Sequence, residues 1–298
     1  MLGAGKALAI LKLARIMFPY INIGPVHLGT FGLFLWLAAV VATVVLHKNF
    51  VRNRVDADAL SVVAFVVIAG VIGAKMWHEL QNVQELRASM RQILVPGWGH
   101  PLEILVGFLH WFQAGFAWFG GLLAGIVTLM WQGRAAKQGD GTSVGAVRML
   151  DLAAPAAAIG YGVGRIGCLT SGDGDYGIPT NLPWGVHMAP DALVPTTARV
   201  HPTPLYELLF SLALGWLLWR LGRKARSTGW MTGLYLALSG VGRFLVEFLR
   251  INPKLYMGMS NAQVAALGSV VVGLLVMVVA GRRSAVQPVV EVSSLDVT

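Results

Sequence analysis

Residues 59–79 read A-L-S-V-V-A-F-V-V-I-A-G-V-I-G-A-K-M-W-H-E, and no charged side chain interrupts this run before Lys75. About 20 mostly apolar residues are enough to cross the hydrocarbon core of a bilayer as a helix. Lipid offers no partner to an unpaired backbone amide, so helices are the expected form. Six further stretches share this character, and they cover residues 27–47, 102–131, 150–170, 204–221, 230–249 and 262–281. The sequence therefore predicts an all-α integral membrane protein with about seven transmembrane helices, the long third stretch containing a break or a tilted entry.

The composition of the whole chain supports this class. Of its 298 residues, 56% are hydrophobic and only 12% are charged, whereas about a quarter of an average soluble domain is charged. The net charge of +9 comes from short Lys and Arg clusters between apolar runs, which is how topology signals are placed. This distribution argues against nucleic acid as a partner. The single cysteine, Cys168, excludes an internal disulfide and a multi-cysteine metal site.

Three segments are expected along the chain. Residues 1–24 carry Lys6, Lys12 and Arg15 among apolar residues and lack an A-x-A-like cleavage site, so an interfacial amphipathic helix is favoured over a signal peptide. Residues 25–283 are expected to form the seven-helix transmembrane domain. Residues 284–298 form a short cytoplasmic tail.

The basic connections predict the orientation. One alternate set holds twelve Lys and Arg, namely Lys48, Arg52, Arg54, Arg134, Lys137, Arg148, Arg220, Arg223, Lys224, Arg226, Arg282 and Arg283. The other set holds eight, namely the three of the N-terminal segment with Arg87, Arg91, Arg199, Arg250 and Lys254. Because the more basic side of a membrane protein is cytoplasmic, we expect the N-terminus outside and the C-terminus inside.

Three basic residues, Lys75, Arg165 and Arg243, fall inside apolar stretches. On insertion scales, each such charge costs about 2.5 to 3.5 kcal/mol at the centre of a membrane helix. Charged residues in these positions therefore mark candidate functional sites. The alternative is a structural ion pair or a side chain that reaches back to the interface. All three lie towards the predicted outer ends of their helices, so they can converge.

The segment G-V-G-R-F-L-V-E-F-L-R, residues 240–250, places Arg243, Glu247 and Arg250 at i, i+4 and i+7. These positions share one helical face. Glu247 can hold Arg243, and the stripe keeps a net positive charge. We therefore expect an anion there, and the planar fork of arginine suits the phosphate of a lipid head group.

A glycine-rich segment, residues 160–177, surrounds Arg165 and ends in a loop with Asp173, Asp175 and Tyr176. Its glycines allow close helix packing. The two aspartates can bind a cation, occupy solvated turn positions, or orient nearby arginines.

The segment R-V-H-P-T-P-L-Y-E, residues 199–207, places His201 before a helix. Thr203 is the expected N-cap, with Pro204 at the first helical position. His201 can transfer protons there, or it can simply hydrogen-bond at the membrane edge.

Taken in order, these motifs resemble the bacterial prolipoprotein diacylglyceryl transferase family. The resemblance rests on G-V-G-R-I-G with its Gly/Asp loop, on H-P-T-P-L-Y-E and on G-V-G-R-F-L-V-E-F-L-R, and I-N-I-G-P-V-H-L-G-T-F-G-L at residues 21–33 resembles the family's approach to its first helix. It covers about residues 20–280.

The resemblance implies a multi-pass enzyme of the bacterial cytoplasmic (inner) membrane, with no metal and no organic cofactor. Such an enzyme transfers the diacylglyceryl group of phosphatidylglycerol to the lipobox cysteine of signal-peptide-bearing prolipoproteins and releases glycerol phosphate. Arg165 and Arg243 match the family's essential arginines, and Glu247 completes that helix motif. The implied lipid-binding residues are Arg165, Arg243, Arg250, Lys75, Gly167 and Tyr206, and membrane lipids surround the site.

The sequence also departs from the family pattern. Phe119 stands where a histidine usually precedes two glycines, Phe31 replaces a usual tyrosine, and Gly29 and Cys168 replace a usual histidine and asparagine. Phenylalanine cannot accept a proton, so the acceptor thiol must lose its proton to another group or ionise near its own pKa. His201, His78 and Glu79 are the candidate bases, with His201 first. A related lipid-modifying transferase with another acceptor, and a non-catalytic lipid- or anion-binding protein or transporter, remain as alternatives.

Overall fold

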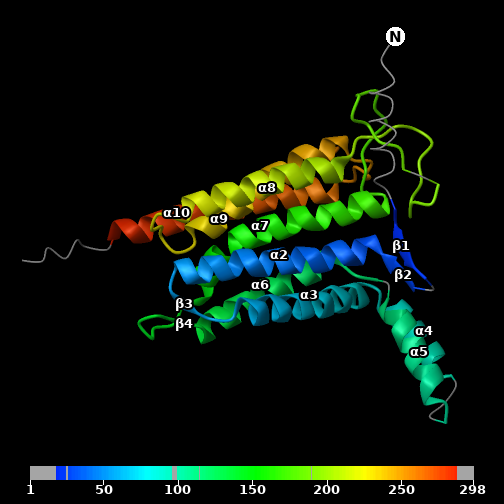
Figure 1. Cartoon of the computed structure of the whole chain (residues 1–298), viewed down its shortest axis with the longest axis horizontal. Coiled ribbons are helices and arrows are strands. Elements are labelled where there is room, and N and C mark those ends of the chain that lie inside the picture. Colours follow the sequence, from blue (N-terminus) through cyan, green and yellow to red (C-terminus); the bar gives the residue numbers. More distant parts are fainter. Residues whose placement is uncertain (1–17, 25, 96–98, 114, 189, 287–298) are drawn as a thin grey trace, which may run out of the picture. The chain divides into compact units, whose positions relative to one another are not determined.

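A computed structural model describes residues 18–24, 26–95, 99–113, 115–188 and 190–286 of the chain. The described residues are mostly helical, and the chain divides into two units, which are treated separately below (Figure 1). The first unit comprises residues up to Asn49 together with those from Asp151 onward. The second comprises Phe50–Leu150.

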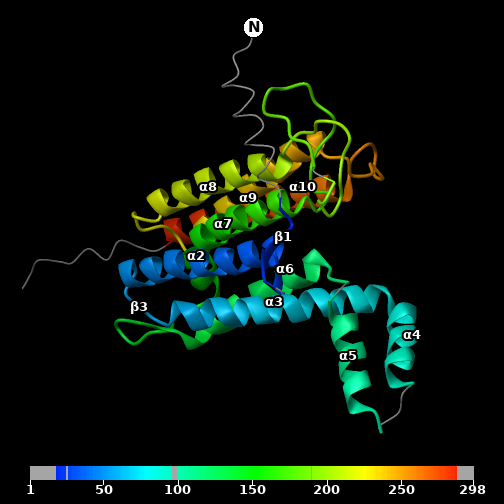
Figure 2. The same ribbon diagram turned by 45° about the vertical axis from the view of Figure 1, so that its right-hand side comes forward.

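The first unit is a set of long helices that run along one another (Figures 1 and 2). Its elements are the antiparallel hairpin β1 (Tyr20–Ile23) and β2 (Val26–Gly29), then α2 (Thr30–Arg52), α7 (Ala146–Ser171), α8 (Thr203–Leu221), α9 (Trp230–Val246), the 3-10 turn η1 (Glu247–Leu249) and α10 (Asn261–Val286). The predicted stretches 27–47, 150–170, 204–221, 230–249 and 262–281 correspond to its five long helices.

Glycines of α7 allow its neighbours to approach closely, as the sequence predicted. A Cβ atom on Gly160 would lie 3.2 Å from that of Ala42 in α2, and one on Gly162 would lie 3.2 Å from that of Ser211 in α8. Larger side chains at these positions would separate the helices. The glycine-rich stretch is therefore a packing surface on two sides of α7.

At the other end of α7, the buried carboxylate of Asp151 organises the start of α9. It accepts hydrogen bonds from the backbone N–H groups of Gly229, at 2.7 Å, and Thr232, at 2.8 Å. The first N–H groups of a helix have no partner within the helix and favour a negative charge nearby. Asp151 therefore caps α9 across a sequence separation of about 80 residues and fixes it against α7.

The loop that follows α7 is held by backbone hydrogen bonds. The N–H of Gly177 donates to the carbonyl of His201 at 2.9 Å, and the N–H of Ile178 donates to the carbonyl of Leu249 at 2.7 Å. A Cβ atom on Gly177 would lie 2.5 Å from that carbonyl oxygen of Leu249, so only glycine fits there. These contacts bring the acidic loop beside the start of α8 and the end of η1.

The second unit contains β3 (Val55–Asp56), α3 (Ala59–Gln81), α4 (Val83–Leu94), α5 (Pro101–Phe112), α6 (Trp118–Ala135) and β4 (Lys137–Gln138), with β3 and β4 antiparallel. Asp58 caps α3 by accepting from the N–H groups of Leu60 and Ser61. The break expected within 102–131 is confirmed, because α5 ends at Phe112 and α6 begins at Trp118. The 12 residues of α5 measure only about 18 Å, too short to cross a bilayer.

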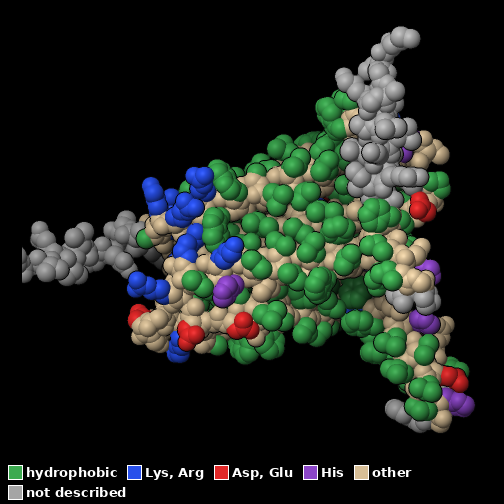
Figure 3. All heavy atoms as spheres, in the orientation of Figure 1, with side chains coloured by type: hydrophobic (Ala, Val, Ile, Leu, Met, Phe, Trp, Pro, Cys, Tyr) green, Lys and Arg blue, Asp and Glu red, His purple; other side chains and the backbone are tan. Residues whose placement is uncertain are grey.

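Five helices are long and apolar enough to cross a membrane, and they cover Thr30–Arg52, Ala59–Gln81, Ala146–Ser171, Trp230–Leu249 and Asn261–Arg282. Most residues of these apolar stretches are not buried within the protein, and hydrophobic side chains cover the flanks of the helices (Figure 3). An apolar surface of this extent needs a lipid environment. The chain is therefore a mostly helical, multi-pass membrane protein.

Two parts of the predicted organisation lie largely outside the described residues. Of the expected interfacial segment 1–24, residues 1–17 are not described. Of the expected tail 284–298, α10 includes residues up to Val286 and the rest is not described. Thr203, the expected N-cap of α8, is instead its first helical residue, and the cap position belongs to Pro202.

The contact between α3 and α6 gives a test of helix packing. A Cβ atom on Gly120 would lie 2.2 Å from the carbonyl oxygen of Gly73, whereas one on Gly125, in the same helix, would lie 3.5 Å from Val66. Overpacking costs about 1 to 3 kcal/mol. We expect Gly120→Ala to lower the midpoint of thermal unfolding in detergent by several degrees and Gly125→Ala to leave it nearly unchanged. Equal midpoints for the two variants would contradict the close backbone approach.

Candidate active site

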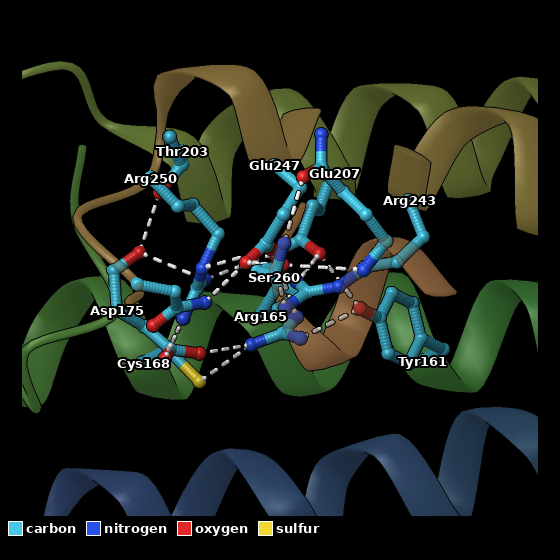
Figure 4. Close-up of polar contacts among 12 residues, drawn as sticks. Tyr161, Arg165, Cys168, Asp175, Thr203, Glu207, Arg243, Glu247, Arg250 and Ser260 are labelled. Atoms are coloured by element: carbon cyan, nitrogen blue, oxygen red, sulfur yellow. Dashed lines mark hydrogen bonds and ion pairs between the residues drawn. The ribbon is translucent and has the colours of Figure 1, made fainter. Parts of the chain in front are cut away.

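Three arginines and three carboxylates meet in the first unit (Figure 4). All six are named here as the charge cluster: Arg165 on α7, Asp175 in the following loop, Glu207 on α8, Arg243 on α9, Glu247 in η1 and Arg250 directly after it. Their contacts explain why charged residues are tolerated in apolar helices. Each charge has an opposite charge within 4 Å.

Glu207 is at the centre of the charge cluster. Its Oε1 accepts a hydrogen bond from Nη1 of Arg243 at 2.7 Å, and its Oε2 lies 3.1 Å from Nε of Arg165. Nη1 of Arg250 lies 3.9 Å from Oε2. The side chain is only 5% exposed, so it is an anion buried among three cations. Glu207 thereby connects α7, α8 and α9 at one point.

Glu247 holds Arg243 as the sequence predicted, with 2.9 Å between its Oε2 and Nη2 of the arginine. Helix α9 ends at Val246 and continues as a 3-10 turn, yet Nε of Arg250 still lies 3.6 Å from the same Oε2. Glu247 Oε1 also accepts hydrogen bonds from Asn252 and from the Ser260 hydroxyl. The turn between α9 and α10 therefore fixes this carboxylate from the opposite side.

Asp175 joins Arg165 and Arg250. Its Oδ2 accepts from Nη1 of Arg165 and its Oδ1 accepts from Nη2 of Arg250. Burial alone would raise the pKa of Asp175, but its hydrogen bond to Arg250 and the charges of both arginines outweigh burial and hold that pKa below its usual value. The sequence left three alternatives for the aspartates of this loop: binding a cation, occupying solvated turn positions, or orienting arginines. The contacts of Asp175 match the third.

The charge cluster is balanced, with three positive and three negative groups. The positive stripe expected from Arg243, Glu247 and Arg250 is neutralised by Glu207 and Asp175, which come from other segments of the chain. Arg243 is the most exposed of the three arginines, with 26% of its side chain accessible against 15% for Arg165. An incoming anion would therefore reach Arg243 most directly.

The remaining donors of Arg165 are also engaged. Its Nη2 donates to the hydroxyl of Tyr161 at 2.6 Å, and its Nη1 lies 3.5 Å from Sγ of Cys168. Tyr161 in turn donates to Glu207 at 2.9 Å. The guanidinium is thus held in one orientation by α7, α8 and the acidic loop together.

Cys168, Asp173 and Asp175 place their polar atoms within 4.8 Å of one another. Cysteine and carboxylate are both metal ligands, but Asp175 already carries Arg165 and Arg250 as ion-pair partners. Those two cations oppose a metal ion at the same carboxylate. Burial raises the pKa of Asp173, and the charge of Asp175 raises it further.

His201, the first candidate base, belongs to a separate group of polar side chains. Its Nδ1 lies 3.1 Å from the hydroxyl of Tyr206, and that hydroxyl accepts a hydrogen bond from Nε1 of Trp184 at 2.8 Å. The predicted lipid-binding Tyr206 is therefore paired with the predicted base. Thr203, between them in sequence, donates from its hydroxyl to the carbonyl of Asp175.

Lys75, with the candidate bases His78 and Glu79, belongs to the second unit. Its Nζ lies 2.8 Å from Oε1 of Glu79, donates to the carbonyl of Trp111 at 2.7 Å and stands 4.1 Å from the ring of Trp111. The sequence left a structural ion pair as an alternative role for Lys75, and the structure contains such a pair between Lys75 and Glu79. Of the three basic residues expected to converge, Arg165 and Arg243 do so through Glu207.

Gly167 lies on the side of α7 that faces α2. A Cβ atom there would lie 3.2 Å from the carbonyl oxygen of Phe31 and 3.2 Å from Cβ of Phe34. Its position allows the first helix to pack next to Arg165. Phe31 itself stands at the start of α2, and Phe119 stands at the start of α6.

Comparison with known proteins identifies the family. A profile of the prolipoprotein diacylglyceryl transferase family matches residues 19–279. The chain belongs to this family. Curated relatives named phosphatidylglycerol–prolipoprotein diacylglyceryl transferase include that of Clostridium tetani, 29% identical over 83% of this chain and 90% of the relative. The relative from Bordetella avium is 30% identical over 90% of this chain and 96% of the relative. The relative from Methylibium petroleiphilum is 32% identical over 88% of this chain and 92% of the relative.

Sequence reasoning missed Glu207 as a member of the charge cluster. A signal was present, because Glu207 lies in the apolar stretch 204–221 and a carboxylate there is as costly as an arginine. Ser260 and Asn252, by contrast, lie in a polar connection where no pattern distinguishes them. Their role is visible only in the contacts with Glu247.

Glu207 gives the sharpest test of the charge cluster. We expect Glu207→Gln to lower the thermal midpoint in detergent and to abolish activity, since breaking a buried ion pair costs about 3 to 5 kcal/mol. Ser211→Ala, at a buried position one turn further along α8, is the matched control. Retention of both the midpoint and the activity by Glu207→Gln would show that the arginines are positioned without it.

Proposed function

We propose that this chain transfers the diacylglyceryl group of phosphatidylglycerol to the lipobox cysteine of prolipoproteins and releases glycerol phosphate. The observation that carries the proposal is the convergence of Arg165 and Arg243 on Glu207, within a family whose curated relatives are named for this reaction. These arginines match the family's G-x-G-R-I-G and G-x-x-R-x-x-V-E-F motifs.

The reaction requires a cationic site for a phosphodiester whose charge grows as the phosphate leaves. Arginine N–H groups suit phosphate oxygens, and groups that are fixed in advance towards developing charge usually contribute most of the rate enhancement. Arg165 and Arg243 are fixed in this way, because Glu207 and Glu247 hold them before a substrate arrives. In this proposal, Arg243 binds the phosphate first because it is the more exposed, and Arg165 stabilises the leaving group.

The other predicted residues have proposed roles around this centre. Arg250 and Glu247 keep the two arginines in place, and Tyr206 with His201 binds the polar part of the lipid head group or transfers a proton. Gly167 allows α2 to approach the lipid site. Separately, Lys75 of the second unit remains proposed as a lipid-phosphate contact, and the proposed reaction uses no metal ion or organic cofactor.

We propose that the protein spans the bacterial cytoplasmic membrane seven times, α6 and α8 joining the five long apolar helices, with residues 25–283 as the catalytic domain. In the first unit, basic side chains gather at the end where α8 and α10 finish (Figure 3). The positive-inside rule places that end in the cytoplasm. The N-terminus, the charge cluster and the prolipoprotein signal peptide then lie on the outer side, and the partners are lipids and prolipoproteins rather than nucleic acid.

Purified protein incubated with phosphatidylglycerol and a lipobox peptide tests the function directly. The peptide is analysed by mass spectrometry for a diacylglyceryl adduct, with a cysteine-to-serine peptide as the negative control. We expect Arg165→Ala and Arg243→Ala each to reduce adduct formation by at least about 100-fold, as the loss of a fixed oxyanion donor does. Arg220→Ala, which removes an arginine stacked on Trp216 of the same unit, should change the rate little. Activity that survives both cluster substitutions would contradict the phosphate assignment.

Phe119 gives a second test, because it replaces a histidine of the family pattern. A phenyl ring neither donates nor accepts a proton, so we expect Phe119→Ala to keep the adduct-forming rate within a few-fold of that of the unchanged protein. Phe119→His should raise the rate if the site follows the family geometry. A loss of more than about 100-fold in Phe119→Ala, with the thermal midpoint unchanged, would contradict this expectation.

A further inference from the structure

Loss of the usual histidine leaves open which group removes the proton from the acceptor thiol. A base must hold a proton during the reaction, which a carboxylate in contact with several arginines does poorly. Asp175, Glu207 and Glu247 each contact two or more arginines within 4 Å. The three carboxylates of the charge cluster are therefore suited to position arginines, not to accept protons.

Asp173 differs from these three in its contacts. Within the described part of the chain, no ion pair includes Asp173, although Arg165 and Asp175 are both near enough to affect its charge. One of its oxygens, Oδ1, accepts the backbone N–H of Asp175 at 3.1 Å. This hydrogen bond closes a turn between Asp173 and Asp175. The three arginines are balanced without it, so Asp173 is a further negative charge beside the charge cluster.

The remaining contact of Asp173 is with a thiol. One of its carboxylate oxygens lies within 4.8 Å of Sγ of Cys168, and that Sγ also lies 3.5 Å from Nη1 of Arg165. The protein's own thiol therefore sits between a carboxylate without an ion pair and the arginine assigned to the leaving phosphate. This is the pair of neighbours that an acceptor thiol needs, namely a proton acceptor on one side and a positive charge on the other.

We propose that Asp173 is the catalytic base that takes the proton from the lipobox thiol, an inference that rests on the proposed transferase function. The S–H proton passes to the Asp173 carboxylate, and the sulfur forms a bond to the diacylglyceryl carbon that carries the phosphate. The C–O bond breaks with its electron pair going to the phosphate oxygen, beside Arg165 and Arg243. Asp173 then returns the proton to the departing glycerol phosphate or to water.

Burial and the neighbouring Asp175 support this role, because they raise the pKa of Asp173 above that of an ordinary carboxyl. A general base becomes more effective as its pKa approaches the working pH. The groups around Asp173 are Cys168 and Arg165 on α7 and Asp175 in its own loop.

A selenocysteine lipobox peptide isolates the proton-transfer step. A selenol is ionised at neutral pH and needs no base, whereas a thiol has a pKa of about 8.5. With the cysteine peptide, we expect Asp173→Asn in the full chain to slow adduct formation by about 100-fold or more, the usual contribution of a general base. With the selenocysteine peptide, the rate of this variant should lie within a few-fold of that of the unchanged protein.

The controls separate a base from a structural residue. Arg165→Ala should be slow with both peptides, and Asp173→Glu, which keeps a carboxylate, should be faster than Asp173→Asn with the cysteine peptide only. Asp191→Asn, at an exposed position of the same loop, should be as active as the unchanged protein. Thermal midpoints and phosphatidylglycerol binding are measured for every variant.

Three outcomes would overturn the inference while leaving the transferase in place. The first is full activity of Asp173→Asn with the cysteine peptide, and the second is an equal loss with both peptides. The third is a loss specific to the cysteine peptide in His201→Gln but not in Asp173→Asn, which would identify His201 as the base. Absence of any adduct from the unchanged protein with either peptide would overturn the proposed function, and the inference with it.

Discussion

The structure of the first unit depends on the burial of one negative charge, that of Glu207, among three guanidinium groups. An isolated carboxylate in an apolar helix is costly, and so is an isolated arginine. Glu207 removes the cost for Arg165 and Arg243 together, because its two oxygens reach both. The helices α7, α8 and α9 are thereby tied in one arrangement, and the arginines face the site before any ligand arrives.

The second carboxylate, Glu247, extends this constraint to the connection between α9 and α10. Ser260 and Asn252, which lie in the same connection as Arg250, donate hydrogen bonds to it. Asp175 extends the constraint to the loop after α7. Gly177 fixes that loop by its backbone contacts with His201 and Leu249. The charge cluster therefore depends on connecting segments as much as on helices, so changes in these loops would alter the positions of its arginines.

Much of this arrangement could be predicted from the sequence. The apolar runs predicted the long helices, because a run of about 20 apolar residues has few alternatives. The cost of buried charge pointed to Arg165 and Arg243, and helical spacing gave the pair of Arg243 with Glu247. The break within 102–131 was also expected. The charge balance was not predicted, because Glu207 reaches Arg243 across 36 residues of sequence and Asp175 reaches Arg250 across 75. Spacing carries no information on such contacts.

Cys168 has a consequence for experiments on this protein. It is the only cysteine in 298 residues, and its sulfur lies beside Arg165 in the charge cluster. The chain therefore contains a single native attachment point for a thiol-reactive probe, without the removal of other cysteines. Because the side chain is 8% exposed, the rate of labelling reports how often the helices around it open. Lipid that occupies the neighbouring arginines would change that rate, so chemical labelling can follow the occupancy of the site in a native membrane.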